Sequence, residues 1–324
     1  MKPGAAAQPS DYPFQRLMLR SILRRLLKAP SAPATPAVLS DLVGMTTNEE
    51  RLYYTQAIQK VRSLSGAVVD LGCWMGSTTV SLVHGLEEAG CKEEIVYGFD
   101  RFIWDDWMDE YLPVVACEYA HGESFLPEVR RRVKAHAHRV RLIPADLTTY
   151  QWQDGAIKLL LIDAMKTWVL GASITRSFFP FLAPGTLVIH QDYKCYDTPW
   201  IPLIQYRLRD LFNFTHGVRR GCTVAFELRE KLPQERITAA ADFSAVTADE
   251  IDAAVSWSAE LLGESGKGWM AGCHIMYHLF VHDAAAARHV ADSYINSGIK
   301  RQGGFAEALR FLENAEQKGE FPPS

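Results

Sequence analysis

One short stretch of the sequence, residues 68–83, combines residue types that can bind a small polar ligand. It reads VVDLGCWMGSTTVSLV: an apolar β-branched run that ends in Asp70, then Gly72 and Gly76, then the start of a helical pattern. Glycine allows a tight turn and close approach of the backbone to a ligand. A helix N-terminus offers free N–H groups and partial positive charge to a carboxylate. The stretch therefore predicts a strand, a turn and a helix that together hold an anionic group.

The spacing in this stretch disfavours a pyrophosphate and favours a nucleoside that carries an amino acid. The pattern D-x-G-x-x-x-G-[ST] is neither the dinucleotide fingerprint G-x-G-x-x-G nor a phosphate loop with Gly-Lys-[ST]. A nicotinamide dehydrogenase would need a second glycine where Cys73 and Trp74 stand, and a tryptophan there would block a pyrophosphate. S-adenosylmethionine is the common ligand of the favoured kind. The residues that we expect to bind it here are Asp70, Gly72, Cys73, Trp74, Gly76, Ser77 and Thr78.

Acids also follow three later apolar runs, and they extend the predicted cofactor site. Asp100 is placed to accept hydrogen bonds from two ribose hydroxyls, as an acid does in dinucleotide folds. Phe102 could cover the adenine face, and Asp146 or its neighbouring backbone could bind the adenine amino group. Arg101 and Asp163 complete the predicted set. An aspartate at a strand end is also a common helix N-cap, but four in sheet order favour a shared ligand.

Methyl transfer from a sulfonium also needs a group that makes the acceptor a better nucleophile. The reaction is an in-line displacement, so alignment supplies most of the rate and a base assists. The candidate bases are His190 and Lys166, with Asp192 as an orienting partner. A histidine has a suitable pKa near neutrality, whereas a lysine needs burial to lower its own. His190 could instead be structural, and Lys166 could be a solvated lysine at a helix start.

The elements that must position these residues alternate between strands and helices. Apolar runs occupy residues 67–71, 94–100, 139–144, 157–163 and 185–192. Short, nearly continuous apolar strands separated by crossover segments indicate a parallel sheet that is covered on both faces. A further run at 222–229 follows a plausible helix at 206–212 and is expected to enter antiparallel or at an edge. The fold class is therefore α/β, a doubly wound Rossmann-like sheet of about seven strands with an antiparallel last strand.

Three segments organise the chain. Residues 1–44 hold a basic amphipathic pattern at 14–28 and a Pro/Ala linker. That pattern could touch an anionic membrane, serve as a transit sequence, or pack on the body or on a second subunit. Residues 45–230 form the predicted cofactor-binding domain. Residues 231–324 turn helical and are expected to cap the carboxyl edge of the sheet or to mediate oligomerisation.

Composition limits the partners. The 324 residues carry a net charge of −4, which argues against a nucleic-acid partner because such proteins concentrate Lys and Arg. No run approaches the roughly 20 apolar residues of a membrane span. Six cysteines without a C-x-x-C pair fit buried thiols in a reducing compartment. We therefore expect a cytoplasmic protein with a small-molecule acceptor, and a homo-oligomer, most simply a dimer.

A family resemblance adds to this interpretation. The segment VVDLGCWMGSTT at 68–79 resembles the first motif of the macrocin O-methyltransferase family, and GFDRF at 98–102 resembles its second. The helical pattern at 48–61 is similar to the helix that precedes motif one. The resemblance covers roughly residues 45–228. It implies S-adenosylmethionine-dependent O-methylation of a small molecule, often a sugar in natural product biosynthesis.

The resemblance also implies a magnesium ion held by acids after the fourth and fifth strands. This chain keeps Asp163 and Asp192 there, but Met165 and Gln191 replace two of the family's acids. Two carboxylates and an amide oxygen could still bind Mg²⁺, although weakly. The segment IDAMK also resembles the Asp-Ala-Asp-Lys element of caffeoyl-CoA O-methyltransferases, where the lysine lies beside the reacting oxygen. Lys166 matches that lysine.

Two alternative functions remain open. The same cofactor site could serve N-methylation of a small amine, because the sequence does not reveal the acceptor pocket. The replaced acids also leave open a non-catalytic S-adenosylmethionine-binding scaffold.

The helical tail repeats histidine every four residues, at His274, His278 and His282. This spacing places the three on one helix face. A zinc site would need ligands that converge from elsewhere, and the neighbouring aromatic residues favour a packed helix. If the tail caps the site, one of these histidines could line the substrate.

Overall fold

The structure is a computed structural model that describes residues 37–112 and 118–322. The amphipathic pattern predicted at residues 14–28 lies outside the described residues, as does most of the segment 1–44. The whole predicted cofactor-binding domain apart from residues 113–117, and the helical tail as far as residue 322, are within them.

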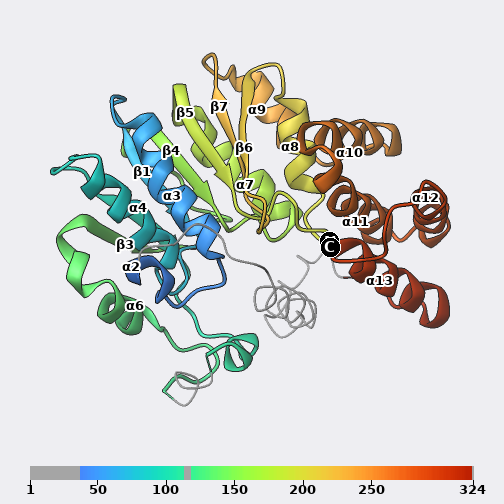
Figure 1. The fold of residues 1–324 in the computed structure, drawn as a ribbon, viewed down its shortest axis with the longest axis horizontal. Coiled ribbons are helices and arrows are strands. Elements are labelled where there is room, and N and C mark those ends of the chain that lie inside the picture. The colour runs from blue at the N-terminus through green and yellow to red at the C-terminus, as the bar shows by residue number, and fades with distance from the viewer. Residues whose placement is uncertain (1–36, 113–117, 323–324) are drawn as a thin grey trace, which may run out of the picture.

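A seven-stranded sheet forms the centre of the molecule (Figure 1). In chain order its strands are β1 (Ala67–Leu71), β2 (Val96–Asp100), β3 (Val140–Pro144), β4 (Ile157–Ile162), β5 (Leu182–His190), β6 (Phe212–Gly217) and β7 (Val224–Leu228). The strand order is β3-β2-β1-β4-β5-β7-β6. Strands β1 to β5 form only parallel pairs with one another, and β7 pairs antiparallel to both β5 and β6. The predicted doubly wound sheet with an antiparallel last strand is confirmed.

Helices cover both faces of the sheet (Figure 1). Before the tail they are α2 (Ala37–Ser40), α3 (Asn48–Val61), α4 (Ser77–Glu88), α6 (Leu126–Arg132), α7 (Trp168–Phe178) and α8 (Trp200–Arg207), with 3₁₀ turns η2 (Asp106–Glu110), η3 (Lys134–Arg139) and η4 (Phe179–Phe181). Helices α3 and α4 pack against Val68 and Leu159 on one face, and α7 and α8 pack near Val69 and Leu160 on the other. Successive side chains of a strand point to opposite faces, so both faces of β1 and β4 must be apolar.

Helix α3 begins at a capping box that also fixes its position on the sheet. The Thr47 hydroxyl accepts from the Glu50 N–H, and the Glu50 carboxylate accepts from the Thr47 N–H. The same buried carboxylate accepts from the N–H groups of Cys222 and Thr223 at 3.0 and 3.2 Å. Glu50 therefore links the start of α3 to the residues that precede β7.

One local prediction was wrong. The helix predicted at 206–212 ends early, because α8 stops at Arg207 and β6 starts at Phe212. Strand β6 lies at the edge of the sheet, where Asn213 and Phe214 are exposed. A half-exposed edge strand with polar residues lacks the continuous apolar run of the central strands, so its sequence did not reveal it.

The tail is helical, as predicted, and extends the core of the sheet. Its helices are α9 (Gln234–Ala240), α10 (Ala248–Leu262), α11 (Glu264–Phe280), α12 (Ala284–Asn296) and α13 (Gly304–Lys318). Phe280 of α11 lies 5.6 Å from Trp200 of α8, measured between ring centroids. Asp283 caps α12 by accepting from the Ala286 N–H, so the long helical run splits there. Among the residues that the structure describes, no helix is long and apolar enough to cross a membrane.

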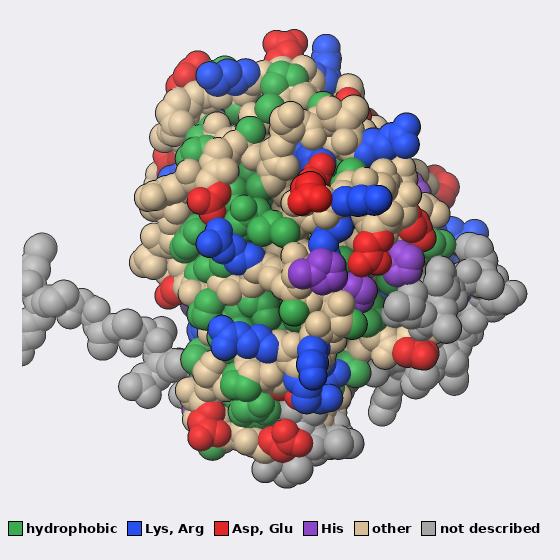
Figure 2. Space-filling model, turned by 90° about the vertical axis from the view of Figure 1, so that its left-hand side faces the viewer, with side chains coloured by type: hydrophobic (Ala, Val, Ile, Leu, Met, Phe, Trp, Pro, Cys, Tyr) green, Lys and Arg blue, Asp and Glu red, His purple; other side chains and the backbone are tan. Residues whose placement is uncertain are grey.

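The face on the β3 side of the molecule carries charges of both signs (Figure 2). Glu128 of α6 pairs with Arg131 and Arg132, and His136 lies 3.3 Å from Glu87. Interspersed acids and bases on this face do not form the continuous basic surface that a phosphate backbone requires.

Candidate active site

The turn between β1 and α4 lies directly against the end of β4. Gly72 and Gly76 both have φ of +85°, where a side chain is strained. A methyl group on Gly72 would lie 2.4 Å from the Asp163 carbonyl oxygen, and the Asp163 N–H donates to Leu71 at 2.7 Å. Only glycine allows the two strand ends to come this close, so the β1 turn and Asp163 form one surface.

Most side chains of this turn point into the protein. Asp70 is fully buried, and its Oδ2 accepts from the hydroxyls of Thr78 and Thr79 at 2.8 and 2.6 Å. Burial raises the pKa of Asp70 to about 6. The Cys73 thiol is buried, and a methyl group on Gly44 would lie 2.1 Å from the Ser77 hydroxyl. These predicted cofactor residues can therefore contact a ligand mainly through their backbone.

Asp100 is held by main-chain donors at the end of β2. Its Oδ2 accepts from the Trp74 N–H at 3.0 Å, and its Oδ1 accepts from the Phe102 N–H at 2.8 Å. Trp74 and Phe102 have φ of 42° and 53°, a left-handed conformation that costs roughly 1–3 kcal/mol per residue. Burial raises the pKa of Asp100, while these two hydrogen bonds oppose the increase. The carboxylate thus fixes two strained residues in one geometry.

The aromatic residues beside Asp100 take different positions. The Phe102 ring is fully buried 5.8 Å from Phe125, so in this structure it does not present a face at the sheet edge. The Trp74 ring is partly exposed and lies 5.6 Å from Trp107. The buried Trp74 Nε1 has no hydrogen-bond partner among the described residues. The pair of tryptophans is the aromatic surface next to the turn.

Asp146 and Arg101 lie at the same sheet edge but are exposed. Oδ1 of Asp146 accepts from both the N–H and the hydroxyl of Thr148, which lowers its pKa. The Ala145 N–H donates to the Asp100 carbonyl at 2.9 Å and joins the ends of β3 and β2. The side chain of Asp146 is thus already used by its own turn.

A lysine joins two acids at the ends of β4 and β5. The Lys166 Nζ lies 2.6 Å from Asp163 Oδ1 and also pairs with Asp192 Oδ2. Asp163 and Asp192 are largely buried, whereas 31% of the Lys166 side chain is exposed. Burial alone would lower the pKa of Lys166, but the two carboxylates raise it well above its ordinary value. Lys166 is therefore a fixed cation that a small molecule can approach.

The pKa of the Asp163 carboxyl is far above its ordinary value. Burial is the main cause that raises its pKa, to about 8, with Asp192 adding to the increase and Lys166 opposing it. The Gln191 amide, oriented with its nitrogen toward the acids, lies 3.0 Å from Asp163 Oδ1 and 2.5 Å from Asp192 Oδ1. With the Gln191 amide in this orientation, the Lys166 ammonium and the amide N–H group both donate to Asp163 and Asp192.

This arrangement does not fit a magnesium ion. Magnesium requires a near-octahedral set of oxygen ligands. Here the Lys166 ammonium lies between the two carboxylates, and the apolar Met165 is buried where the families that the sequence resembles have an acid. Asp163 and Asp192 could bind Mg²⁺ only if Lys166 moved away.

His190 lies apart from this cluster. Its ring is fully buried, with the Tyr193 and Phe226 rings at 6.2 and 6.4 Å. Neither ring nitrogen has a hydrogen-bond partner among the described residues. Burial lowers the pKa of His190 to about 4, and the neighbouring Gln205 side chain opposes this decrease. In this structure the imidazole belongs to the core, whereas Lys166 and Asp192 form an ion pair.

Sequence reasoning missed Asp197, which lies near the same cluster. It is buried, and its Oδ1 has no partner among the described residues. Burial raises its pKa to about 7; Asp192 adds to the increase and Lys166 opposes it. A second acid five residues after Asp192, on the loop that follows a core strand, was the available signal.

The helical tail fixes the loop that carries Asp192. The Tyr193 hydroxyl is 2.8 Å from the Ser258 hydroxyl of α10, and the Cys273 thiol of α11 donates to the Cys195 carbonyl at 3.0 Å. The tail therefore packs behind the cluster, and the described part of it supplies no histidine to Lys166 or Asp192.

The strand order and the antiparallel β7 together identify the fold. It is that of the S-adenosylmethionine-dependent methyltransferases. No protein-family model and no curated protein matches the sequence. Similar solved structures include the O-methyltransferase NovP, at 15% identity and a TM-score of 0.47 over 67% of this chain and 98% of that one. Another is apo CalS11, a TDP-rhamnose 3'-O-methyltransferase of calicheamicin biosynthesis, at 13% identity and 0.46 over 67% and 95%.

Proposed function

We propose that this protein transfers a methyl group from S-adenosylmethionine to a hydroxyl group of a small polar acceptor, such as a sugar or another natural product. The observation that carries the proposal is the Lys166 cation and its two acids lying directly against the β1 turn. One side of this edge suits a cofactor, and the other suits the activation of a hydroxyl.

The residues at the β1 and β2 ends suit S-adenosylmethionine. Each Asp100 oxygen accepts one main-chain hydrogen bond and keeps lone-pair capacity for a ribose hydroxyl. The first N–H groups of α4, from Ser77 onward, have no helical acceptor and suit the cofactor's carboxylate. When bound, the cofactor supplies an electrophilic methyl group on a sulfonium.

We assign the base to Asp192 and the electrostatic role to Lys166. Because the pKa of Lys166 is raised, its ammonium keeps its proton near neutrality and cannot act as the base. The Asp192 carboxylate takes the proton of the acceptor hydroxyl, and Lys166 stabilises the negative charge that develops on that oxygen. With S-adenosylmethionine bound, that oxygen would receive the methyl group and the sulfur would leave as a neutral sulfide, while Asp192 and Lys166 would act on the acceptor hydroxyl alone.

The same cation favours hydroxyl over amine acceptors and replaces a metal ion. A protonated amine has no lone pair with which to attack a methyl carbon, and a neutral amine develops no negative charge for Lys166 to stabilise. A hydroxyl that loses its proton would be attracted. With Lys166 between the carboxylates, the reaction needs no magnesium.

A calorimetric titration with S-adenosylmethionine tests the cofactor site. We expect the wild-type chain to bind it with the same affinity in excess Mg²⁺ and in EDTA, and Asp100→Ala to lose most of that affinity. Asp154→Ala is the matched control and should bind normally, because this exposed acid precedes β4 and lies at the other end of the strand from Asp163. If the wild-type chain does not bind, the proposed function fails and only the fold stands.

A methyl-transfer assay then tests the chemistry. Hydroxylated sugars, phenols and amines are offered in parallel, and methylated product is measured by mass spectrometry. We expect product from a hydroxyl acceptor at a rate that EDTA does not change. A rate that falls in EDTA and returns with Mg²⁺ would contradict the role of Lys166. Tight cofactor binding without turnover of any acceptor would favour a non-catalytic binding protein.

A further inference from the structure

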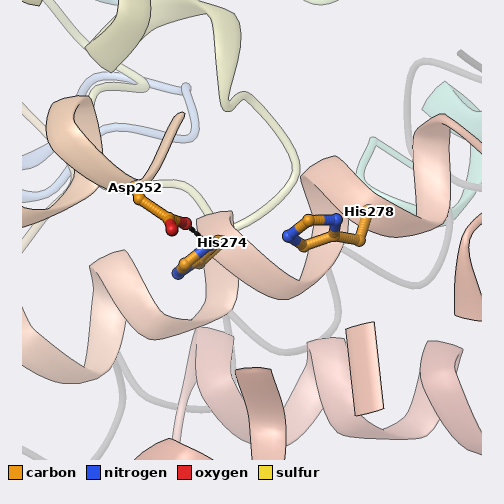
Figure 3. Close-up of side chains that lie close together, drawn as sticks. All are labelled: Asp252, His274 and His278. Carbon is orange, nitrogen blue, oxygen red and sulfur yellow. Dashed lines mark ion pairs between the residues drawn. The ribbon is translucent and has the colours of Figure 1, made fainter. Parts of the chain in front are cut away.

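Three metal-ligating side chains converge in the helical tail, away from the candidate active site (Figure 3). They are Asp252 of α10 with His274 and His278 of α11, and one ligand atom from each lies within 4.8 Å of the others. His274 and His278 are buried, whereas Asp252 is exposed. The cluster therefore lies at the surface of the helical layer, within reach of an ion in solution.

The geometry of His274 is that of a metal ligand with a supporting partner. Its Nδ1 lies 3.0 Å from the hydroxyl of Tyr294, on α12. Its Nε2 lies 2.5 Å from Asp252 Oδ1, yet the two groups do not have hydrogen-bond geometry. A partner on one ring nitrogen fixes the tautomer and leaves the other nitrogen for a metal. Nε2 thus faces a carboxylate without a well-formed bond to it.

We propose that Asp252, His274 and His278 bind a divalent transition metal ion of the zinc class. Two imidazoles and a carboxylate are a donor set that zinc favours, whereas magnesium and calcium prefer oxygen ligands alone. A fourth position toward solvent completes a tetrahedron. In such a site the ligands lie about 3.3 Å apart, given bonds of about 2.0 Å. The Asp252 carboxylate must therefore move back by roughly 1 Å from His274, and its exposed side chain allows this.

The site is not the one that the histidine spacing alone suggests. His282 lies beyond the end of α11 with φ of +61°, and its ring stacks on Phe321 at 4.7 Å. It does not join His274 and His278. The third ligand comes instead from α10, a helix that folds back beside α11.

An ion at this site would join the two helices that hold the loop after β5. Ser258 of α10 contacts Tyr193, and Cys273, the neighbour of His274, contacts Cys195. Both contacts lie next to Asp192 in sequence. The ion would therefore stabilise the folded state at the base of that loop, because it binds the folded chain and not the unfolded one.

Metal titration of the tag-free full-length chain tests the site. The chain is first stripped with EDTA and exchanged into chelator-free buffer. Co²⁺ then reports tetrahedral nitrogen and oxygen ligands by its visible absorption, and Zn²⁺ displaces it. We expect one equivalent to bind, with affinity reduced roughly tenfold or more in Asp252→Asn, His274→Ala and His278→Gln. His289→Ala on α12 and Asp249→Asn on α10 are the controls and should bind like wild type.

Two results would overturn the proposal. One is wild-type binding no tighter than that of the three ligand variants. The other is one-equivalent binding that Asp252→Asn and His278→Gln leave unchanged, which would place the ion elsewhere. Circular dichroism in EDTA shows whether each variant is folded. If a histidine variant is unfolded, the metal affinity of Asp252→Asn decides the test, because Asp252 is exposed and its substitution leaves the helix packing intact.

Discussion

Two acid sites lie at the same edge of the sheet and are stabilised by different means. At the end of β2, Asp100 accepts hydrogen bonds from the main chain at Trp74 and Phe102. At the ends of β4 and β5, Asp163 and Asp192 are held by side chains, chiefly by ion pairs with Lys166. One site has a geometry fixed by the backbone, and the other has charges that can shift and protonate.

This difference suits two different tasks. Main-chain donors stay in place whatever is bound, so Asp100 can present a constant geometry to a cofactor. Side-chain donors can move, and a coupled set of acids and a lysine can accept or release a proton during a reaction. The comparison predicts that substitutions at β2 affect binding and that substitutions at β4 and β5 affect turnover.

The largest effect is expected from Asp192→Asn. Removing the proposed base should lower kcat by roughly 10²- to 10⁴-fold. The Kd for S-adenosylmethionine should change by less than about threefold, because the main-chain-held site is untouched. Steady-state kinetics and calorimetry give both values, with Asp154→Asn as the control. A parallel loss of affinity and turnover would remove the division between the two sites.

Asp100→Asn should give the converse result. The asparagine oxygen can accept from only one of the two N–H groups. The amide NH₂ of the asparagine then faces the other N–H, and two donors cannot form a hydrogen bond. We expect the Kd for S-adenosylmethionine to rise roughly 10- to 100-fold, because hydrogen bonds to charged groups contribute about 1.5–3 kcal/mol. The kcat at saturating cofactor should stay within about threefold of wild type. Asp146→Asn, whose carboxylate is used by its own turn, should change the Kd far less; an equal effect would contradict the assignment.

Asp70 provides an intermediate case, a buried acid that is held by side-chain hydroxyls. Thr79→Val removes the 2.6 Å hydrogen bond and leaves only Thr78. We expect the free energy of unfolding to fall by about 1–2 kcal/mol in urea titrations. Thr79→Ser keeps the hydroxyl and should recover most of the loss. If serine is no better than valine, packing of the methyl group and not the hydrogen bond stabilises this position.

Much of the fold could be predicted from the sequence because the central strands are apolar throughout. The pattern at 67–71 becomes β1 without change, and the helix predicted at 48–61 is α3. Strand β6 was missed because its polar edge position hides the strand pattern. Helix α12 was not separated from α11, because the break depends on one capping acid, Asp283.

The site was less predictable, since it depends on side-chain directions. The sequence placed Lys166 and Asp192 together, and spacing from two strand ends is sufficient for that. It could not show that the His190 ring turns into the core, because that depends on which face of β5 the residue occupies. It also could not show that Asp252 meets His274, because two helices must first fold together.

The pH dependence of stability provides the finest test of the comparison. The pKa of Asp163 is about 8 in the folded chain, against an ordinary value of 3.8. The folded state therefore holds this proton more tightly than the unfolded state, so its stabilising contribution is full below about pH 4 and is lost as pH rises through about 8. Asp163→Asn cannot release a proton and should lack this loss.

We expect the wild-type chain to lose about 1.4 kcal/mol or more of unfolding free energy relative to Asp163→Asn between about pH 5 and pH 9, the equivalent of one pKa unit. Urea titrations at both pH values measure the difference. Asp146→Asn is the control, because the lowered pKa of Asp146 keeps it ionised across this window. If the unfolding free energies of wild type and Asp163→Asn changed equally with pH, Lys166 would be keeping Asp163 ionised. The charge of Asp163 would then be as constant across this pH range as the geometry of Asp100, and Asp163 would take no part in proton transfer.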